Sequence, residues 1–251
     1  MIDFTPWDKL LHRYVENGQV DYTQWQAESA PVLDQWLASV SNTDIDKLEQ
    51  EEAIAFLINL YNALAIRQVL QKYPIDTIRP KIMGVPNWAS FLRFFKKDIY
   101  ELNGQALSLD EIEHGILRAR YTEPRIHFAL VCVSESCPHL RPEAYLPEQL
   151  DAQLEEDTRR FINNPEKVNY DVNSNTLYCS KIFDWYEKDF LTQSDTISHY
   201  IQQYLEDSKI PPDTTIEYLP YSWQLNQRTS SKNRLSAVSE TPIPQRKPII
   251  K

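Results

Sequence analysis

The sequence contains little glycine, with only four glycines among its 251 residues. Loops that bind nucleotide phosphates need several glycines close together, because the backbone must approach the phosphate groups. No glycine-rich loop of this kind occurs in the sequence. Rossmann and P-loop nucleotide-binding folds are therefore not expected.

Cysteine is also scarce, and the three that occur (Cys132, Cys137 and Cys179) are too few, and odd in number, for a disulfide scaffold. The N-terminus has neither the basic segment nor the apolar segment of a signal peptide. No apolar run approaches the roughly 20 residues that cross a bilayer. We therefore expect no membrane span, a cytoplasmic location, reduced thiols and no cofactor.

Basic residues are outnumbered by acidic ones, and the formal net charge is -10. A surface of that sign repels phosphate backbones, so we expect no nucleic-acid partner. The last residues, 229–251, differ in charge, with five basic residues against Glu240 alone. This segment is expected to be a disordered basic tail, and the alternative is a weak electrostatic tether to an acidic partner.

Apolar residues are plentiful at 42%, which supplies a sizeable core. Residues 51–73 show apolar side chains at three- and four-residue spacing, which predicts a helix that ends before Pro74. Asn59 and Asn62 lie one turn apart in this apolar segment, where Asn is a poor helix former. They are expected either to bond neighbouring loops or to line a pocket.

Two hairpins are expected, at 99–108 around Asn103-Gly104 and at 168–180 around 173–175. Residues 125–133 form a nearly continuous apolar run, which predicts a buried central strand. Hairpins imply antiparallel pairing. The predicted fold class is α+β, mainly helical with a central, largely antiparallel sheet. We expect one globular domain over 1–228, with a helical N-terminal extension at 1–45.

The most reactive chemistry is expected around Cys137. Proline is favoured at the first position of a helix, so Pro138 predicts a helical turn that begins at Cys137. A thiol there would be activated by the helix dipole. His127 is the expected base, with His114 or His139 as other imidazoles near the thiol and Glu113 orienting the base. The alternative is an inert loop cysteine with histidines that serve the core.

Two further interpretations of the cysteines remain open. Cys132, Cys137 and His139, with His114 or His127, have donors suited to zinc, but their spacing matches no standard zinc motif. A redox pair of Cys132 and Cys137 lacks the spacing of thioredoxin-like motifs. Cys132 is expected to pack in the core, because it shares a strand face with Phe128 and Leu130.

Several blocks of the sequence resemble the domain of unknown function 547 family, in the order of that family and over about 50–226. They are Ala55–Leu64, Glu111–Arg118, Pro124–Cys132, Ser136–Pro138, Lys181–Phe190 and Tyr218–Asn226. The chain departs from the family at Val133, where glycine is usual, and at His139, where proline or a small residue is usual.

The resemblance implies a polar set of site residues. The set comprises Asn59, Tyr61, Asn62, Glu113, His114, Arg125, His127, Cys137, Asp184, Tyr186 and Asp189. Our leading hypothesis is a thiol-dependent hydrolase or acyl transferase with a papain- or transglutaminase-like arrangement. Cys137 would be the nucleophile and His127 the base, oriented by Glu113 or by Asp184 in its place.

The other members of the set would bind substrate, which we expect to be a small molecule, a peptide or a protein. These substrate-binding residues are Asn59, Asn62, Tyr61, Arg125, Asp184 and Tyr186. His114 is assigned to the catalytic group, where it would position the substrate or donate to an oxyanion together with the two asparagines. The alternative functions are a non-catalytic module that binds a protein or peptide and, below it, a structural zinc site.

Overall fold

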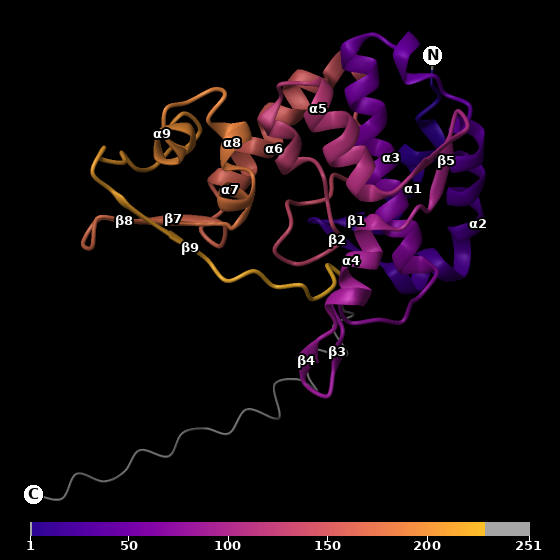
Figure 1. Cartoon of the computed structure of the whole chain (residues 1–251), viewed down its shortest axis with the longest axis horizontal. Coiled ribbons are helices and arrows are strands. Elements are labelled where there is room, and N and C mark those ends of the chain that lie inside the picture. Colours follow the sequence, from indigo (N-terminus) through magenta and orange to yellow (C-terminus); the bar gives the residue numbers. More distant parts are fainter. Residues whose placement is uncertain (1, 229–251) are drawn as a thin grey trace, which may run out of the picture.

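The computed structural model describes residues 2–228, and the expected disordered tail lies outside this range. The chain is about 48% helical, and Figure 1 shows the helices grouped around α3 with a smaller lobe beside them. The helices are α1 Thr5–Tyr14, α2 Tyr22–Val40, α3 Gln50–Leu70, α4 Trp88–Lys96, α5 Arg118–Arg120, α6 Leu150–Ile162, α7 Ile182–Trp185, α8 Glu187–Phe190 and α9 Ile197–Gln202.

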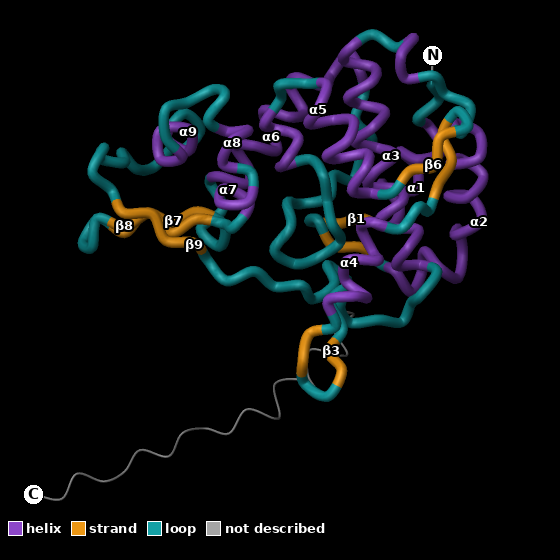
Figure 2. The backbone as a smooth tube through the Cα atoms, in the orientation of Figure 1, coloured by secondary structure: helices purple, strands orange, loops and turns teal. Residues whose placement is uncertain are grey.

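The strands are short and form small separate sheets. They are β1 Val15–Glu16, β2 Gln19–Val20, β3 Lys81–Ile82, β4 Val85–Pro86, β5 Tyr100–Leu102, β6 Gln105–Leu107, β7 Val168–Asp171, β8 Thr176–Cys179 and β9 Thr215–Tyr218. The pairs β1–β2, β3–β4, β5–β6 and β7–β8 are antiparallel hairpins, and β9 joins β8 in parallel. The α+β, mainly helical class is confirmed. The sheets of β3–β4, β5–β6 and β7–β9 lie toward the edges of the molecule, whereas β1–β2 lies nearer its middle (Figure 2).

Both predicted hairpins are present, as β5–β6 and β7–β8. Asn103 and Gly104 have φ angles of 50° and 79°, the left-handed values that a tight two-residue turn requires. These turns were predictable because their chemistry is local.

Helix α3 forms the centre of the larger core. It is long and apolar enough to cross a membrane by length and composition, but 94% of its apolar window is buried inside the protein. Helices α1 and α2 pack beside it and contribute a group of tryptophans, in which Trp7 stacks on Trp36 with ring centroids 5.6 Å apart. The helix is therefore the core of a folded domain rather than evidence of a membrane span.

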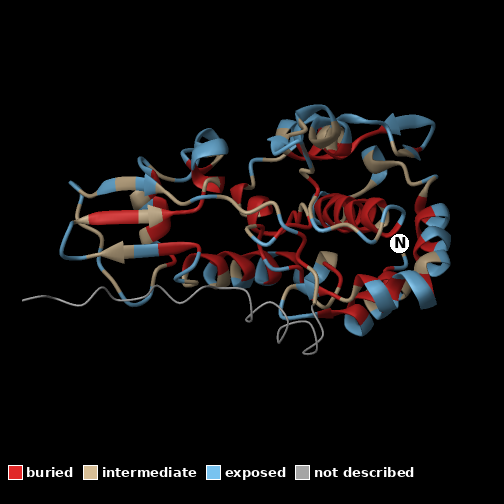
Figure 3. Ribbon diagram, turned by 90° about the horizontal axis from the view of Figure 1, so that it is seen from below, coloured by how far each residue is buried: buried red, intermediate tan, exposed pale blue. Residues whose placement is uncertain are grey.

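A second, smaller core lies in the lobe that contains β7–β9. It is built largely from aromatic side chains, including Phe128, Phe161, Phe183, Phe190 and Tyr200. Buried stretches occur in both parts of the molecule (Figure 3). The two cores meet near residues 128–137, where the sequence predicted its reactive site.

The predicted strand at 125–133 is wrong. Residues Pro124–Phe128 form a 3₁₀ helix, and an extended loop without a partner strand follows. Asn62 takes the place of a neighbouring strand, since it donates to the carbonyl of Ala129 (3.0 Å) and accepts from the N–H of Val131 (2.8 Å). A buried loop is tolerated when its backbone groups are satisfied in this way.

Asn59 does the same for a second loop. Its side chain donates to the carbonyl of Tyr145 (2.7 Å) and accepts from the N–H of Tyr145 (3.0 Å) and from the indole of Trp7 (3.0 Å). Asn59 and Asn62 therefore bond neighbouring loops from a core helix. Neither residue is in the lining of the cavity described below, and the substrate-binding roles expected for them stay predictions.

Candidate functional site

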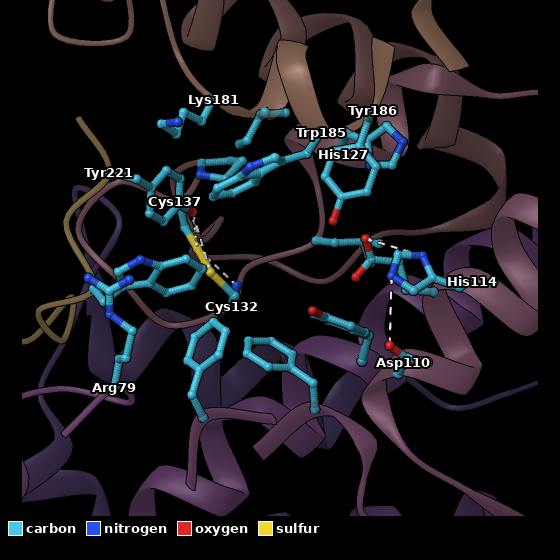
Figure 4. A pocket seen from close by; sticks show the side chains of 18 of the residues that line it. Arg79, Asp110, His114, His127, Cys132, Cys137, Lys181, Trp185, Tyr186 and Tyr221 are labelled. Atoms are coloured by element: carbon cyan, nitrogen blue, oxygen red, sulfur yellow. Dashed lines mark hydrogen bonds and ion pairs between the residues drawn. A yellow bond between two sulfur atoms is a disulfide. The ribbon is translucent and has the colours of Figure 1, made fainter. Parts of the chain in front are cut away.

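A cavity of about 540 Å³ lies where the two cores meet. Aromatic rings line one side, and titratable groups line the other (Figure 4). The lining residues are Tyr61, Arg79, Trp88, Phe91, Phe95, Asp110, Glu113, His114, His127, Leu130, Cys132, Cys137, Pro138, Lys181, Ile182, Trp185, Tyr186, Tyr221 and Trp223. Deep cavities with aromatic walls and a few polar groups are typical of small-molecule sites.

Two cysteines form part of the cavity wall, and they are joined by a disulfide between Cys132 and Cys137. Cys137 is 3% exposed, and Cys132 is more accessible. The expectation of reduced thiols is therefore wrong for these two residues. The expected packing of Cys132 is present, since its partly buried side chain packs against the larger core. The pairing was weighed from the sequence but ranked low, because the two residues lack C-x-x-C spacing.

The loop from 132 to 137 explains how this spacing still allows a bond. No helix begins at Pro138, so the expected activation of Cys137 by a helix dipole is wrong. Val133 adopts a φ of 59°, a conformation that glycine accepts and a β-branched residue resists. The resemblance implies glycine at this position. Valine adopts the left-handed backbone there instead, and the loop therefore stores local strain.

The segment 222–226 holds this loop in place. Asn226 N–H donates to the carbonyl of Val133 (3.0 Å), and Glu135 N–H donates to the carbonyl of Gln224 (2.8 Å). Ser222 N–H donates to Ser136 Oγ (2.8 Å). Part of the block Tyr218–Asn226, which was quoted for the family resemblance, therefore has a structural role, since it holds the loop of Cys132 and Cys137 in place.

Polar groups point at both sulfur atoms. The Tyr221 hydroxyl lies 3.3 Å from Cys137 Sγ and 3.5 Å from Cys132 Sγ. The Ser134 hydroxyl lies 3.3 Å from Cys137 Sγ, and the N–H of Cys132 donates to the same sulfur at 3.1 Å. Burial raises the pKa of Tyr221, so its hydroxyl stays protonated as a donor. These donors are suited to stabilising a thiolate.

His127 lines the cavity on another side and is nearly buried. Its Nε2 lies 2.7 Å from Asp189 Oδ2, and its ring stacks on Tyr186 at 3.8 Å. Arg118 completes this group with two bonds to Asp189, of 2.6 and 2.9 Å. The hydrogen bonds of His127 and of Cys137 do not join the two side chains, and they lie apart in Figure 4. The expected nucleophile–base contact is not formed.

The environment of His127 predicts a pH effect on stability. Burial lowers the pKa of His127, although the hydrogen bond to Asp189 opposes this. Below the unfolded pKa of about 6.5, the unfolded chain binds a proton that the folded chain excludes. Stability from His127 is therefore full above this pH and falls as the pH drops, by at most about 1.4 kcal/mol per unit.

Between pH 7 and pH 5, the free energy of unfolding should fall by about 1–2 kcal/mol less in His127→Gln than in the unmodified protein. Urea denaturation at both pH values would measure it. His12→Gln is the matched control, because His12 is exposed on α1. An unchanged pH slope in the His127 variant would show that the imidazole titrates normally in the folded protein.

Glu113 is buried near the hydroxyls of Tyr61 and Tyr186. Burial first, and the Glu113 carboxylate second, raise the pKa of both tyrosines. The residue lies on a π-helix at Glu111–Leu117, and such wide turns are frequent at functional sites. Asp189, rather than the expected Glu113 or Asp184, orients His127.

His114 is the most exposed of the predicted site residues in the cavity. Its Nδ1 lies 3.0 Å from an Arg118 nitrogen, and its Nε2 lies 3.9 Å from Asp110. The structure therefore brings together in one cavity the predicted residues Tyr61, Glu113, His114, His127, Cys137 and Tyr186.

Two predicted substrate-binding residues lie elsewhere. Arg125 forms ion pairs with Glu123 (2.7 Å) and Asp151 (2.8 Å), and it ties the 3₁₀ helix to α6. Asp184 is exposed and is not part of the cavity lining. The sequence contains the ion-pair partners of Arg125 but does not reveal the pairing. The substrate-binding roles of Arg125 and Asp184 stay predictions.

The zinc alternative fails on placement. His139 packs against Gly18 and belongs to a separate small cavity with Asp157 and Lys167. Within residues 2–228, no three His, Cys, Asp or Glu side chains are grouped as a metal site needs. The proposed set of two cysteines and two histidines is therefore not assembled there.

Several site residues were missed or given no role from the sequence. Tyr221 lies in a quoted resemblance block, and Asp189 was marked by the resemblance, but neither had an assigned function. The aromatic wall of Trp88, Phe91 and Trp223 comes from segments far apart in the chain. A cluster of aromatics with turn residues at 86–95 was the only local signal for this wall.

Comparison with known proteins identifies part of the chain. Residues 45–162 match the family described as "Protein of unknown function, DUF547". Over these residues the chain is similar to DUF547. The match confirms the resemblance within residues 45–162, which include α3, the π-helix and the loop of Cys132 and Cys137. The blocks Lys181–Phe190 and Tyr218–Asn226 lie outside it. A search of curated proteins and a search of solved structures each gave no match.

Proposed function

We propose that this protein is a thiol-dependent enzyme that carries out thiol–disulfide exchange in its cavity. The observation that carries the proposal is the Cys132–Cys137 pair in the cavity wall, with hydroxyl and N–H donors directed at its sulfurs. Disulfide exchange needs an accessible sulfur to attack and a stabilised thiolate to leave. Cys132 supplies the first, and Cys137 supplies the second.

In the oxidised form, a substrate thiolate would attack Sγ of Cys132. The Cys132–Cys137 bond breaks, and its electron pair leaves on Cys137, where Tyr221 and Ser134 donate to the thiolate. A second thiol of the substrate then attacks the substrate sulfur of the mixed disulfide and releases Cys132. The substrate dithiol is oxidised to a disulfide, and the protein pair takes up two electrons and two protons. A small-molecule or protein disulfide would reoxidise the pair.

The test uses the reduced full chain and glutathione disulfide. We expect Cys132 to form a mixed disulfide with glutathione and then to resolve into the Cys132–Cys137 bond, with release of two glutathione thiols. This oxidation should be about 100-fold faster than modification of Cys179, because thiolate fraction and access govern the rate. Burial raises the pKa of Cys179 to about 12, which makes it an internal control. Timed alkylation and peptide mass spectrometry would follow each cysteine.

Single substitutions distinguish the roles of the two cysteines. Cys137→Ser should trap the glutathione adduct on Cys132, and Cys132→Ser should slow oxidation by about 100-fold. Cys179→Ala should behave as the unmodified protein. If the folded, reduced pair failed to close while the urea-unfolded chain closed readily, thiol–disulfide exchange would be ruled out.

The second candidate is the thiol-dependent hydrolase or acyl transferase predicted from the sequence. The observation that favours it is the buried His127, oriented by Asp189 in the same cavity as Cys137. It requires reduced Cys137 and movement of His127 toward it. With p-nitrophenyl esters as the probe, this activity would survive Cys132→Ser and would be lost in Cys137→Ser, whereas exchange needs both sulfurs.

A binding role without chemistry is the third candidate, and the aromatic wall favours it. A cytoplasmic location remains part of the proposal, and the thiols and disulfides present there would set the ratio of dithiol to disulfide in the pair. If neither sulfur reacts in the folded protein, peptide or small-molecule binding becomes the leading interpretation.

A further inference from the structure

The segment from Arg79 to Lys97, which we call the arm, contains β3, β4 and α4. The β3–β4 hairpin extends away from the body of the protein (Figures 1 and 2). The arm carries large exposed apolar side chains. The exposed fractions are 98% for Met83 and 65% for Val85 on the hairpin, and 56% for Trp88 and 48% for Leu92 on α4. Single exposed apolar residues are normal, but a group on one projecting segment indicates a contact surface.

The charge of the arm is opposite to that of the chain. It contains five basic residues and no acidic one, in a protein with a net charge of -10. The basic residues are Arg79, Lys81, Arg93, Lys96 and Lys97. All of them except Arg79 are exposed. The arm therefore combines an apolar tip with a cationic flank.

We propose that the arm docks on an anionic lipid surface. Apolar side chains that enter the interface, flanked by lysine and arginine near anionic headgroups, are the usual chemistry of peripheral membrane binding. Tryptophan prefers this interface, and Trp88 stands beside the hairpin. A protein partner would need a pocket shaped to Met83, whereas headgroups accept a projecting side chain without one.

The negative net charge does not prevent this contact. Charges on the body act over about 8 Å at physiological ionic strength, and the hairpin extends away from the body. The arm also forms part of the cavity wall through Trp88 and Phe91. Arg79 lies between the rings of Trp88 and Trp223, at 5.5 and 5.6 Å. Docking would bring this wall to the lipid surface, whatever reaction the sulfurs perform.

The test is co-sedimentation of the full chain with phosphatidylcholine vesicles that contain 30% phosphatidylserine or none. We expect binding to the anionic vesicles alone, and weakening by added salt. Lys81→Gln with Arg93→Gln and Lys97→Gln should lower the partition coefficient about 100-fold, since each basic residue near such a surface strengthens binding about fivefold. The matched control, with the same change in net charge, is Lys9→Gln with Lys188→Gln and Lys209→Gln.

The apolar tip has its own variant. Met83→Asn with Val85→Ser should weaken binding about tenfold, and asparagine tolerates the φ of 50° at position 83. Val172→Ser with Leu191→Ser changes two exposed apolar residues elsewhere and should leave binding unchanged. Equal binding by the arm variants would place any attraction elsewhere, such as in the basic residues 229–251, and would overturn the proposal. Absence of binding to anionic vesicles at low salt would overturn it as well.

Discussion

Replacing Asn59 by alanine is expected to lower the free energy of unfolding by about 4 kcal/mol. Its side chain is 1% exposed and bonds three groups, which are the indole of Trp7 and the N–H and carbonyl of Tyr145. Alanine would leave these groups buried without partners, and each costs about 1–3 kcal/mol. Urea denaturation followed by tryptophan fluorescence would measure the change.

The matched control is Asn173→Ala in the exposed β7–β8 turn, which should change stability by less than about 0.5 kcal/mol. Asn59→Asp gives an intermediate test, because it keeps an acceptor for two of the bonds and loses the donor to Tyr145. A loss below about 1 kcal/mol in Asn59→Ala would mean that water or a shifted loop satisfies these groups, and that α3 does not hold the loop.

The sequence predicted the parts of the fold that depend on local chemistry. Helix α3 follows from its apolar spacing, and the β5–β6 hairpin follows from Asn103-Gly104. The strand expected at 125–133 failed because an apolar run alone does not reveal its partner. Asn62, more than 60 residues away, satisfies the backbone there and makes a partner strand unnecessary.

The candidate site was predicted in its composition but not in its pairings. The sequence placed His127, Cys137, Glu113 and Tyr186 near one another, and they line one cavity. It paired His127 with Cys137, whereas His127 bonds Asp189 and Cys137 bonds Cys132. These pairings depend on how α8 and the cysteine loop dock, which residue spacing does not specify.

The sequence feature that best indicated the site was the occurrence of polar residues within apolar segments. Buried polar groups need partners or a function, and the marked residues divide between the two. Asn59, Asn62 and Arg125 have partners, since each bonds neighbouring segments of the protein and lies outside the cavity lining. Glu113 and His114 face the cavity, where a ligand has access to them.

Asp189→Asn is expected to lower the free energy of unfolding by about 3 kcal/mol at pH 7. The carboxylate accepts two bonds from Arg118 and one from His127, and bonds to charged groups contribute about 1.5–3 kcal/mol each. The estimate is reduced because the Asp189 side chain is 25% exposed. The asparagine would also place its amide N–H₂ opposite an N–H donor of Arg118 or His127, where no hydrogen bond can form. Urea denaturation would measure the loss, with Asp184→Asn as the exposed control.

The same variant distinguishes the two proposed reactions, provided it is assayed at a temperature where circular dichroism shows it folded. The oxidation of Cys132 by glutathione disulfide should change less than about threefold, because Asp189 contacts neither sulfur. Ester hydrolysis, if the chain performs it, should fall about 10⁴-fold, since the base would lose its orienting carboxylate. An equal fall in both activities would instead indicate that the cavity depends on the Arg118–Asp189 pair for its shape, because the cation of Arg118 would then be left without its partner beside the ring of Tyr186.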